Sequence, residues 1–305
     1  MIHGFVVIDK PAGITSHDVV SRVRRILGTR KVGHTGTLDP FATGVLPIAV
    51  NEGTKAIPFL DEGVKCYEAF LQLGVATDTL DMTGTILREL DCSAISEQQF
   101  LDACNRFTGS ILQIPPMYSA IKQGGQPLYK LARAGQEVER APRPVEIYAI
   151  ELLSFASPFA SIRVICSRGT YIRTLADDIG ALLGCGAALK ELRRTASGPF
   201  TLATSYTLED LERAADEGNI SSCCISPCAA LAHLPDVELV DSGLAKLSFG
   251  RSPLWSDTTN EVSRLPDETD LVRLSHNGTL MAVARLVAGA DGLPEIVLKR
   301  VLLVS

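Results

Sequence analysis

The sequence contains no apolar stretch long enough to cross a membrane or to serve as a secretion signal. Its first hydrophobic run, Phe5–Ile8, stops at Asp9 and Lys10, whereas a membrane helix needs about 20 apolar residues and a signal core about 7–15. We therefore expect a cytoplasmic protein. The 305 residues, 46% hydrophobic and 21% charged, are typical of a globular chain with one large and one small domain.

Closely paired cysteines are also missing. The eight cysteines are scattered along the chain, which is typical of reduced thiols rather than of a disulfide framework. Cys223, Cys224, Cys228 and His233 have side chains that zinc can use, but their spacing lacks the C-x2-C pairs of structural zinc sites. We expect small thiols here and no metal.

The chain has no overall excess of positive charge, since its net charge is −6. Its basic residues are nevertheless concentrated in the segments Asp18–Asp39, Lys122–Arg143 and Arg163–Arg194. A distant acidic surface does not cancel such clusters beyond a Debye length of about 8 Å. The clusters are therefore either phosphate-binding surfaces for a nucleic acid or ordinary solvated faces.

Hydrophobic periodicity predicts strands and helices that mix without strict alternation. Because a parallel doubly wound sheet would alternate strictly, we predict an α+β domain with a mixed, largely antiparallel sheet. The expected strands include Gly4–Asp9, Cys66–Leu73 and Val145–Phe155, and the expected helices begin after Thr15 or Ser16, after Ser96 and near Tyr171.

Changes in composition divide the chain. Residues 114–146 form a basic insertion that starts at a proline pair and contains a short helix around Pro127–Ala134. A boundary near Leu234–Pro235 separates a large domain, residues 1–234, from a small one, residues 235–305. Short β-rich runs between turns predict that the small domain is a β-barrel.

The segment most indicative of chemistry is Gly33–Gly44, with the sequence GHTGTLDPFATG. Its small residues let a ligand approach the backbone, and they surround His34 and Asp39. It also follows the most basic stretch of the chain. Composition alone is equally compatible with a tight surface loop.

This segment resembles the catalytic-loop motif of the TruB family, the tRNA pseudouridine-55 synthases. Further segments resemble family motifs in the same order, so that the resemblance covers residues 4–210. These segments are KPAGITS at residues 10–16, YEAFLQLGVATDTLDMTG from Tyr67 to Gly84, IPPMYSA at residues 114–120 with Lys122, RGTYIRTL at residues 168–175 and LRRT at residues 192–195.

The resemblance implies an enzyme that converts a uridine in the T-loop of tRNA to pseudouridine. The reaction breaks the bond from ribose C1′ to uracil N1, turns the base and joins C1′ to C5. Asp39 matches the catalytic aspartate, which can attack C1′, stabilise an oxocarbenium-like centre or remove the C2′ proton. Because the product is an isomer of the substrate, no cofactor or metal is implied.

Other matched positions complete the implied site. Arg173 corresponds to the arginine that pairs with the aspartate, and we expect it to lower the pKa of Asp39 and to orient the carboxylate. Tyr67 corresponds to the tyrosine that stacks on the flipped uracil and can move a proton late in the reaction. The implied substrate-binding residues are Tyr67, Tyr171, Leu192, His34 and Lys10.

The implied partner is tRNA, with the insertion gripping the T-arm. The C-terminal part is similar to a PUA domain, an RNA-binding module, in its size, position and β pattern. We expect a monomer with no membrane association and no obligate protein partner. Two alternatives remain open. One is a guide-RNA-dependent pseudouridine synthase of the same superfamily, which typically lacks the insertion, and the other is a non-catalytic tRNA-binding or folding protein.

Overall fold

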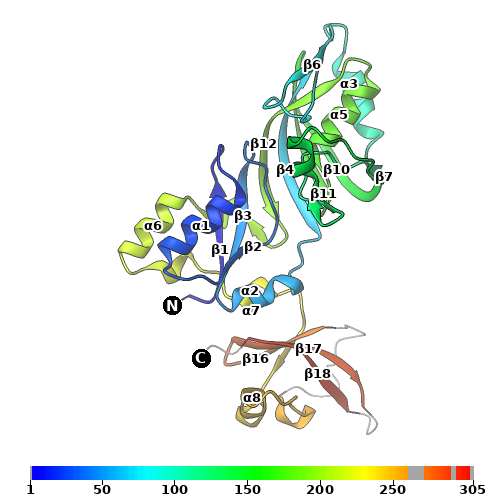
Figure 1. Ribbon diagram of the computed structural model, residues 1–305. Coiled ribbons are helices and arrows are strands. Elements are labelled where there is room, and N and C mark those ends of the chain that lie inside the picture. Colours follow the sequence, from blue (N-terminus) through cyan, green and yellow to red (C-terminus); the bar gives the residue numbers. More distant parts are fainter. Residues whose placement is uncertain (1, 260–270, 290–292, 303–305) are drawn as a thin grey trace.

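The computed structural model describes residues 2–259, 271–289 and 293–302 (Figure 1). Its main feature is a ten-stranded sheet. The strands of this sheet are β1 (Gly4–Lys10), β2 (Val32–His34), β3 (Thr43–Val50), β4 (Val64–Leu73), β7 (Gly109–Gln113), β10 (Arg143–Ala156), β11 (Phe159–Ser167), β12 (Ala187–Ser197), β13 (Phe200–Thr201) and β14 (Ser205–Tyr206).

The central path of the sheet runs β14-β1-β3-β12-β4-β11-β10-β7, with β2 paired to β3 and β13 paired to β12. On this path, β1 with β14 and β3 with β12 are parallel, and the other neighbouring strands are antiparallel. The predicted α+β fold with a mixed, largely antiparallel sheet is therefore confirmed. The order also places β12 directly between β3 and β4.

Helices cover the sheet in two groups. α1 (Ser16–Ile26) and α6 (Leu208–Asp216) lie together near β1 and β3, whereas α3 (Glu97–Asn105) and α5 (Ile172–Leu182) lie at the other half of the sheet (Figure 1). Capping boxes at Thr15, Ser96 and Thr207 satisfy backbone N–H groups at the starts of α1, α3 and α6. The predicted helix starts at Thr15 or Ser16 and after Ser96 are confirmed.

The basic insertion has its own small structure. A hairpin of β8 (Lys122–Gln123) and β9 (Gln126–Pro127) leads into α4 (Leu128–Arg133), and Gly135 follows with a positive φ of 70°. The predicted short helix is therefore confirmed, with glycine in the position that ends helices. Leu128 is buried and ties the segment to the protein, while Lys122, Lys130 and Arg133 are exposed or partly exposed.

The C-terminal region forms a second sheet, in the order β15-β16-β17-β18. Its strands are β15 (Asp236–Glu238), β16 (Val272–His276), β17 (Thr279–Ala288) and β18 (Pro294–Val301). Within the described residues this sheet is open, so the predicted closed barrel is wrong for that part of the chain. β15 has three residues and pairs with β16, and β18 pairs with β17, so the two outer strands do not meet.

The two sheets share a hydrophobic cluster. From the large sheet it takes residues of β1 and β3, and from the C-terminal region it takes residues of β17 and the segment after β18. This packing fixes the C-terminal sheet below the N-terminal half of the large one (Figure 1). The cluster includes Phe5, Val7, Val45, Ala49, Leu280, Val283 and Leu302.

Shorter elements connect these parts. They are α2 (Gly53–Ala56), α7 (Pro227–Ala230), α8 (Asp241–Ser248), the hairpin β5 (Val75–Thr77) with β6 (Ile86–Glu89), and the 3-10 turns η1 (Ile57–Phe59), η2 (Leu202–Thr204), η3 (Ile220–Cys223) and η4 (Trp255–Asp257). No helix in the described ranges is long and apolar enough to cross a membrane. The eight cysteines are free thiols, and no group of His, Cys, Asp or Glu in the described residues could hold a metal ion.

Gly44, where the loop 35–42 enters β3, is confined by the neighbouring strand. It has a φ of 100°, and a Cβ there would lie 2.2 Å from the backbone oxygen of Arg194. A left-handed residue with a Cβ costs about 1–2 kcal/mol, and overpacking adds about 1–3 kcal/mol. We expect Gly44→Ala to lower the melting temperature clearly more than Gly28→Ala, because Gly28 also has a positive φ but has nothing within 4 Å. Equal losses in thermal unfolding would contradict this packing.

Candidate active site

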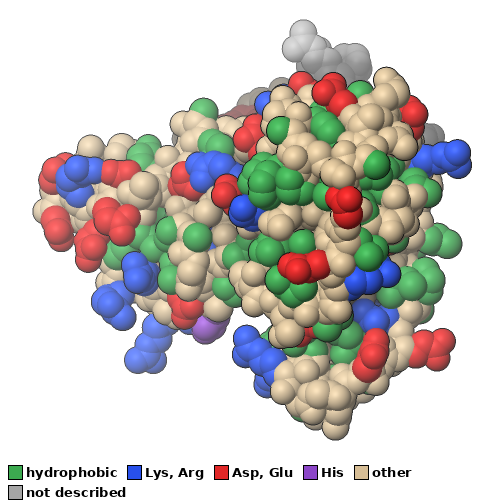
Figure 2. All heavy atoms as spheres, turned by 90° about the horizontal axis from the view of Figure 1, so that it is seen from above, with side chains coloured by type: hydrophobic (Ala, Val, Ile, Leu, Met, Phe, Trp, Pro, Cys, Tyr) green, Lys and Arg blue, Asp and Glu red, His purple; other side chains and the backbone are tan. Residues whose placement is uncertain are grey.

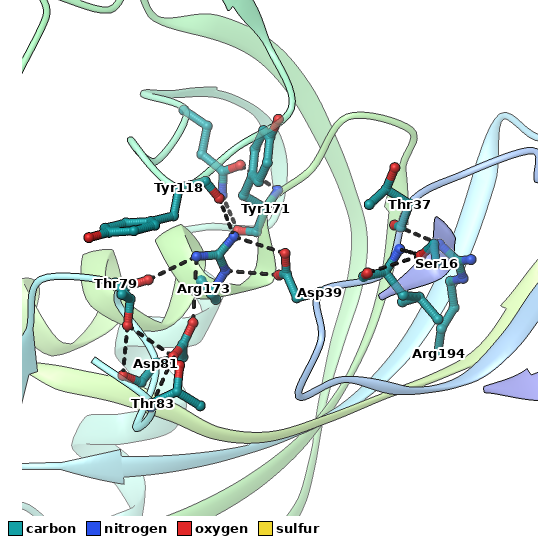
Figure 3. Close-up of polar contacts among 12 residues, drawn as sticks. Ser16, Thr37, Asp39, Thr79, Asp81, Thr83, Tyr118, Tyr171, Arg173 and Arg194 are labelled. Atoms are coloured by element: carbon teal, nitrogen blue, oxygen red, sulfur yellow. Dashed lines mark hydrogen bonds and ion pairs between the residues drawn. The ribbon is translucent and has the colours of Figure 1, made fainter. Parts of the chain in front are cut away.

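Asp39 and Arg173 form a two-pronged ion pair. Nε of Arg173 lies 2.9 Å from one Asp39 oxygen, and Nη2 donates to the other oxygen at 3.1 Å. The Arg173 side chain is 4% exposed and that of Asp39 is 33% exposed. Such a fork fixes the plane of the carboxylate, so Asp39 is held in a defined orientation toward Arg173 (Figure 3). The pairing that the resemblance implied is present.

The remaining donors of Arg173 bind segments that are far apart in the sequence. Nη1 donates to the backbone oxygen of Thr79 at 3.0 Å and lies 3.5 Å from a carboxylate oxygen of Asp81. Nη2 also donates to the backbone oxygen of Tyr118 at 2.8 Å. Every nitrogen of the guanidinium therefore has a partner, and the start of the basic insertion is tied to the same arginine as Asp39 (Figure 3).

Asp81 is a buried carboxylate that the sequence reasoning did not single out, although it lies within the matched Tyr67–Gly84 run. Its side chain accepts hydrogen bonds from the Thr79 hydroxyl and from the backbone N–H and hydroxyl of Thr83. An aspartate flanked by two threonines in a glycine-containing turn is a local signal for such a side-chain-capped turn. Its proximity to Arg173 could not be read from that signal.

The pKa of Asp39 departs from the expected direction. Burial raises the pKa of the Asp39 carboxyl above its ordinary value, and the negative charge of Asp81 acts in the same direction, whereas the charges of Arg173 and Lys10 oppose the change. Arg173 does favour the carboxylate, as expected, but desolvation outweighs it. The lowering influence expected of Arg173 is therefore present, but the net change in the pKa of Asp39 is upward.

The loop around Asp39 is fastened by residues of the KPAGITS segment. The Ser16 hydroxyl accepts from the backbone N–H of Leu38 at 2.8 Å and lies 3.1 Å from the Leu38 oxygen. The N–H of Gly13 donates to the oxygen of Pro40 at 2.8 Å. The backbone on both sides of Asp39 is thus held by the turn that precedes α1, which explains why the two motifs occur together.

Lys10, expected among the substrate-binding residues, is fully buried. Its ammonium group donates to the backbone oxygens of Pro11, Pro40 and Ala42 at 2.8, 3.1 and 2.7 Å. Burial lowers the pKa of Lys10 to about 8. With its donors directed at these carbonyls, Lys10 holds the loop and offers no ammonium surface to a substrate.

Arg194 holds the same loop from β12. Its Nε donates to the oxygen of Val45 at 2.8 Å, and its two terminal nitrogens donate to the oxygens of Thr37 and Gly36 at 3.4 and 3.2 Å. The LRRT segment resembles a family motif, but the sequence does not indicate which of its two arginines is buried. The structure buries Arg194 and leaves Arg193 partly exposed.

Two of the expected pocket residues lie on neighbouring strands. Tyr67 on β4 and Leu192 on β12 are both largely buried, and the strands pair so that Leu192 is opposite Ala69 and Arg194 is opposite Tyr67. Burial raises the pKa of the Tyr67 phenol, with Arg194 opposing the change and Asp39 adding to it. The charges of Arg194 and Asp39 therefore both influence the pKa of Tyr67, in opposite directions.

Tyr171 precedes α5 and lies beside the Asp39–Arg173 pair (Figure 3). Its backbone N–H donates to the Gln113 carboxamide oxygen at 2.9 Å, and the Gln113 amide donates to the Tyr171 backbone oxygen at 3.0 Å. Gln113 is buried and was not identified from the sequence. Burial raises the pKa of Tyr171, so its phenol is neutral at ordinary pH.

His34 ends β2 at the start of the loop and is half-buried. Burial, followed by the charge of Arg194, lowers the pKa of His34, which favours the neutral imidazole. Its Nδ1 is buried and has no hydrogen-bond partner among the described residues. Nδ1 of His34 therefore makes no hydrogen bond to the loop backbone.

Charge is distributed unevenly on the surface around this site. Figure 2 shows Lys and Arg side chains grouped on the side of α1 and acidic side chains at the tip formed by α6. Arg22, Arg25, Arg30 and Lys31 are exposed on or just after α1. The basic cluster on α1 is therefore a surface feature that can contact a polyanion, despite the net charge of −6, whereas Arg173 and Arg194 of the third cluster are buried.

Two family descriptions match the chain. "TruB family pseudouridylate synthase (N terminal domain)" matches residues 24–172, and "tRNA pseudouridylate synthase B C-terminal domain" matches residues 173–231. Among curated relatives, the tRNA pseudouridine synthase B of Geotalea uraniireducens is 54% identical over 95% of this chain and 93% of its own. That of Geobacter sulfurreducens is 50% identical over 94% of each chain.

Solved structures show the same similarity at lower identity. The crystal structure of a Cbf5–Nop10–Gar1 complex matches with a TM-score of 0.73 and 29% identity, over 99% of this chain and 85% of that one. The archaeal box H/ACA sRNP Nop10–Cbf5 complex matches with a TM-score of 0.73 and 28% identity, over 99% and 86% of the two chains.

The titration of Asp39 can be measured directly. We expect its carboxyl, followed by carbon-13 NMR, to titrate above the ordinary value of 3.8, because burial disfavours the charged form. In Arg173→Met the midpoint should rise further, since an opposing positive charge is removed while Asp81 remains. Asp91, an exposed aspartate whose pKa is lowered by hydrogen bonds from Ser93, serves as the internal control. A midpoint for Asp39 at or below that of Asp91 would contradict the dominance of burial.

Proposed function

The chain belongs to the TruB family of pseudouridylate synthases, and we propose from this membership that it isomerises uridine 55 in the T-loop of tRNA to pseudouridine. It is an enzyme of the tRNA pseudouridine synthase B class, as its relatives at 43–54% identity indicate. The bond between C1′ and N1 breaks, the uracil turns, and C1′ joins C5. The C5 proton is lost and N1 gains one, so substrate and product are isomers.

The observation that carries the proposal is the oriented carboxylate of Asp39. Arg173 holds both of its oxygens, and one third of its side chain remains exposed. A carboxylate held in this way can stabilise positive charge at C1′, form a bond to it or accept the C2′ proton without reorganising. Asp39 is the catalytic group in this proposal, and Arg173 orients it.

The surrounding side chains fit a flat, uncharged base. Tyr67, Tyr171 and Leu192 supply aromatic and aliphatic surfaces for the flipped uracil. The raised pKa of Tyr67 keeps its phenol protonated, as a late proton carrier requires. We assign His34 to displacement of the base from its stack, and Lys10, because of its buried contacts, to the positioning of the Asp39 loop.

The RNA-binding surface extends beyond this pocket. We assign residues 1–234 to the catalytic domain, the insertion at residues 114–146 to the T-arm, and residues 235–305 to a PUA-like module for the acceptor-stem side. The accessible Lys122, Lys130 and Arg133 support the assignment of the insertion, because phosphate contacts supply most of the non-specific affinity for RNA. We further propose that the protein acts in the cytoplasm, where its tRNA substrate lies, as a monomer without an obligate partner.

A guide-RNA-dependent enzyme is the second candidate, because the solved structures that match over the whole chain are Cbf5 complexes. Two observations favour the stand-alone enzyme. The identity to tRNA pseudouridine synthase B relatives reaches 54%, against 29% for Cbf5, and the basic insertion is a folded element with its own hairpin and helix. Turnover of a bare T-arm stem-loop by the purified protein would exclude both a guide requirement and a purely non-catalytic role.

The catalytic assignment is tested by Asp39→Asn, which keeps the shape of the side chain and removes its charge. We expect pseudouridine formation on the stem-loop, measured by tritium release, to fall to background while RNA affinity stays within about threefold. Asp102→Asn, an exposed aspartate on α3, should retain the wild-type rate. Substantial product from the Asp39 variant would rule out Asp39 as the catalytic group.

The insertion is tested by replacing Lys122, Lys130 and Arg133 with alanine. We expect weaker tRNA binding and a log–log salt dependence that is flatter by about one unit for each phosphate that the variant no longer neutralises. Arg213→Ala, which removes an exposed arginine of α6 paired with Asp210, is the matched control and should change neither quantity. An unchanged affinity and slope in the triple variant would identify the insertion as a solvated face.

A further inference from the structure

Arg194 lies on β12, between β4, the strand of Tyr67, and β3, the strand that follows the Asp39 loop. It is opposite Tyr67 of β4 and opposite Gly44 of β3. It is 1% exposed and heads the largest fully buried side chains of the protein. A guanidinium in this place connects the two strands that supply the proposed catalytic aspartate and the proposed base-stacking tyrosine.

The guanidinium of Arg194 holds the Asp39 loop on both sides of its catalytic residue. It donates to Gly36 and Thr37 before Asp39 and to Val45 after it. These contacts are separate from those of Lys10, which bind Pro40 and Ala42. Arg194 therefore holds the loop to β12 (Figure 3), whereas Lys10 holds it to β1.

Among the described residues, Arg194 has no acidic partner. None of the ion pairs in this part of the chain includes it, while Arg173, Arg163 and Arg193 each pair with a carboxylate. A buried charge without a counter-ion is costly, and an apolar side chain would usually stabilise such a site better. Within the described residues, the guanidinium of Arg194 is therefore bound by backbone oxygens, and no carboxylate forms an ion pair with it.

The neighbours of Arg194 include groups of the proposed reaction. After burial itself, the Arg194 charge is the next cause that lowers the pKa of His34. Burial raises the pKa of the Tyr67 phenol, and Arg194 is the main opposing influence. Because an arginine stays protonated at every accessible pH, the charge of Arg194 always favours a neutral His34 and always offsets part of the effect of burial on the pKa of Tyr67.

We propose that Arg194 is a positioning residue of the reaction, which fixes the Asp39 loop relative to Tyr67 and places opposite the tyrosine a positive charge that is paired with no carboxylate of the described residues. It touches no substrate and acts through Asp39 and Tyr67. This inference rests on the proposed function, because it takes the roles of those two residues from there.

Two substitutions test the proposal. Arg194→Met removes the charge and all three donors, and we expect the single-turnover rate on the stem-loop to fall about a hundredfold, as a misplacement near 1 Å can cause. Arg194→Lys keeps the charge, but one ammonium cannot reach carbonyls on both sides of Asp39, so we expect a loss of about tenfold. In both variants KM and RNA affinity should stay within about threefold, since the substitutions remove no group that binds the substrate.

The control is Arg163→Met on β11, which removes a half-exposed arginine that pairs with Glu68 and Glu151 on the strand next to β4. It should leave the rate unchanged. Rates are referred to the folded fraction, measured by thermal unfolding of each variant. A rate per folded molecule that equals wild type in Arg194→Met, with only a lower melting temperature, would overturn the proposal and leave Arg194 a purely structural residue.

A double-mutant cycle with Tyr67→Phe isolates the link to the phenol. If Arg194 acts partly through the Tyr67 hydroxyl, the double variant with Arg194→Met should be faster than the product of the two single losses predicts. Strictly additive losses would overturn that link. The proposed function fails separately, and would do so if the wild-type protein did not convert the stem-loop or if Asp39→Asn retained activity.

Discussion

The site depends on the burial of the Arg173 guanidinium. This one guanidinium binds both carboxylate oxygens of Asp39 and donates hydrogen bonds to the backbone oxygens of Thr79 and Tyr118. It also forms an ion pair with the carboxylate of Asp81. A buried arginine is tolerated only where its donors are satisfied, so these segments must all be in place before it can be buried. The geometry of the carboxylate is therefore a consequence of the completed fold, and loss of any partner would leave a desolvated charge.

The loop that carries Asp39 shows how a segment of small residues becomes rigid. Its backbone oxygens are bound by two buried cations, Lys10 from β1 and Arg194 from β12, and its Leu38 is bound by Ser16. Gly44, at the end of the loop, has a positive φ that favours glycine. The two long basic side chains reach the loop from the neighbouring strands and bind its backbone oxygens. Lys10 and Arg194 belong to types of residue that often bind phosphate, but here their side chains bind backbone oxygens of the loop.

The proposed RNA binding is compatible with the net charge of −6, because the charges are unevenly distributed. Exposed basic residues occur together on α1 and on the insertion, and acidic residues gather at α6 (Figure 2). Tyr118, the first residue after the proline pair and methionine of the insertion, shares Arg173 with Asp39. One guanidinium therefore holds both Asp39 and the start of the insertion.

Local rules and motif order determined much of this protein in advance. Capping residues predicted the starts of α1 and α3, hydrophobic periodicity predicted β1, β4 and β10, and the ordered motifs paired Asp39 with Arg173. These features depend on residues a few positions apart, or on a family pattern that already encodes the pairing. Tertiary structure alone decided the burial of Lys10, the inward course of Arg194, the place of Asp81 and Gln113, and the open C-terminal sheet. It also reversed the pKa direction of Asp39, because desolvation depends on how many distant segments pack around a group, and that number is set only when the strands come together.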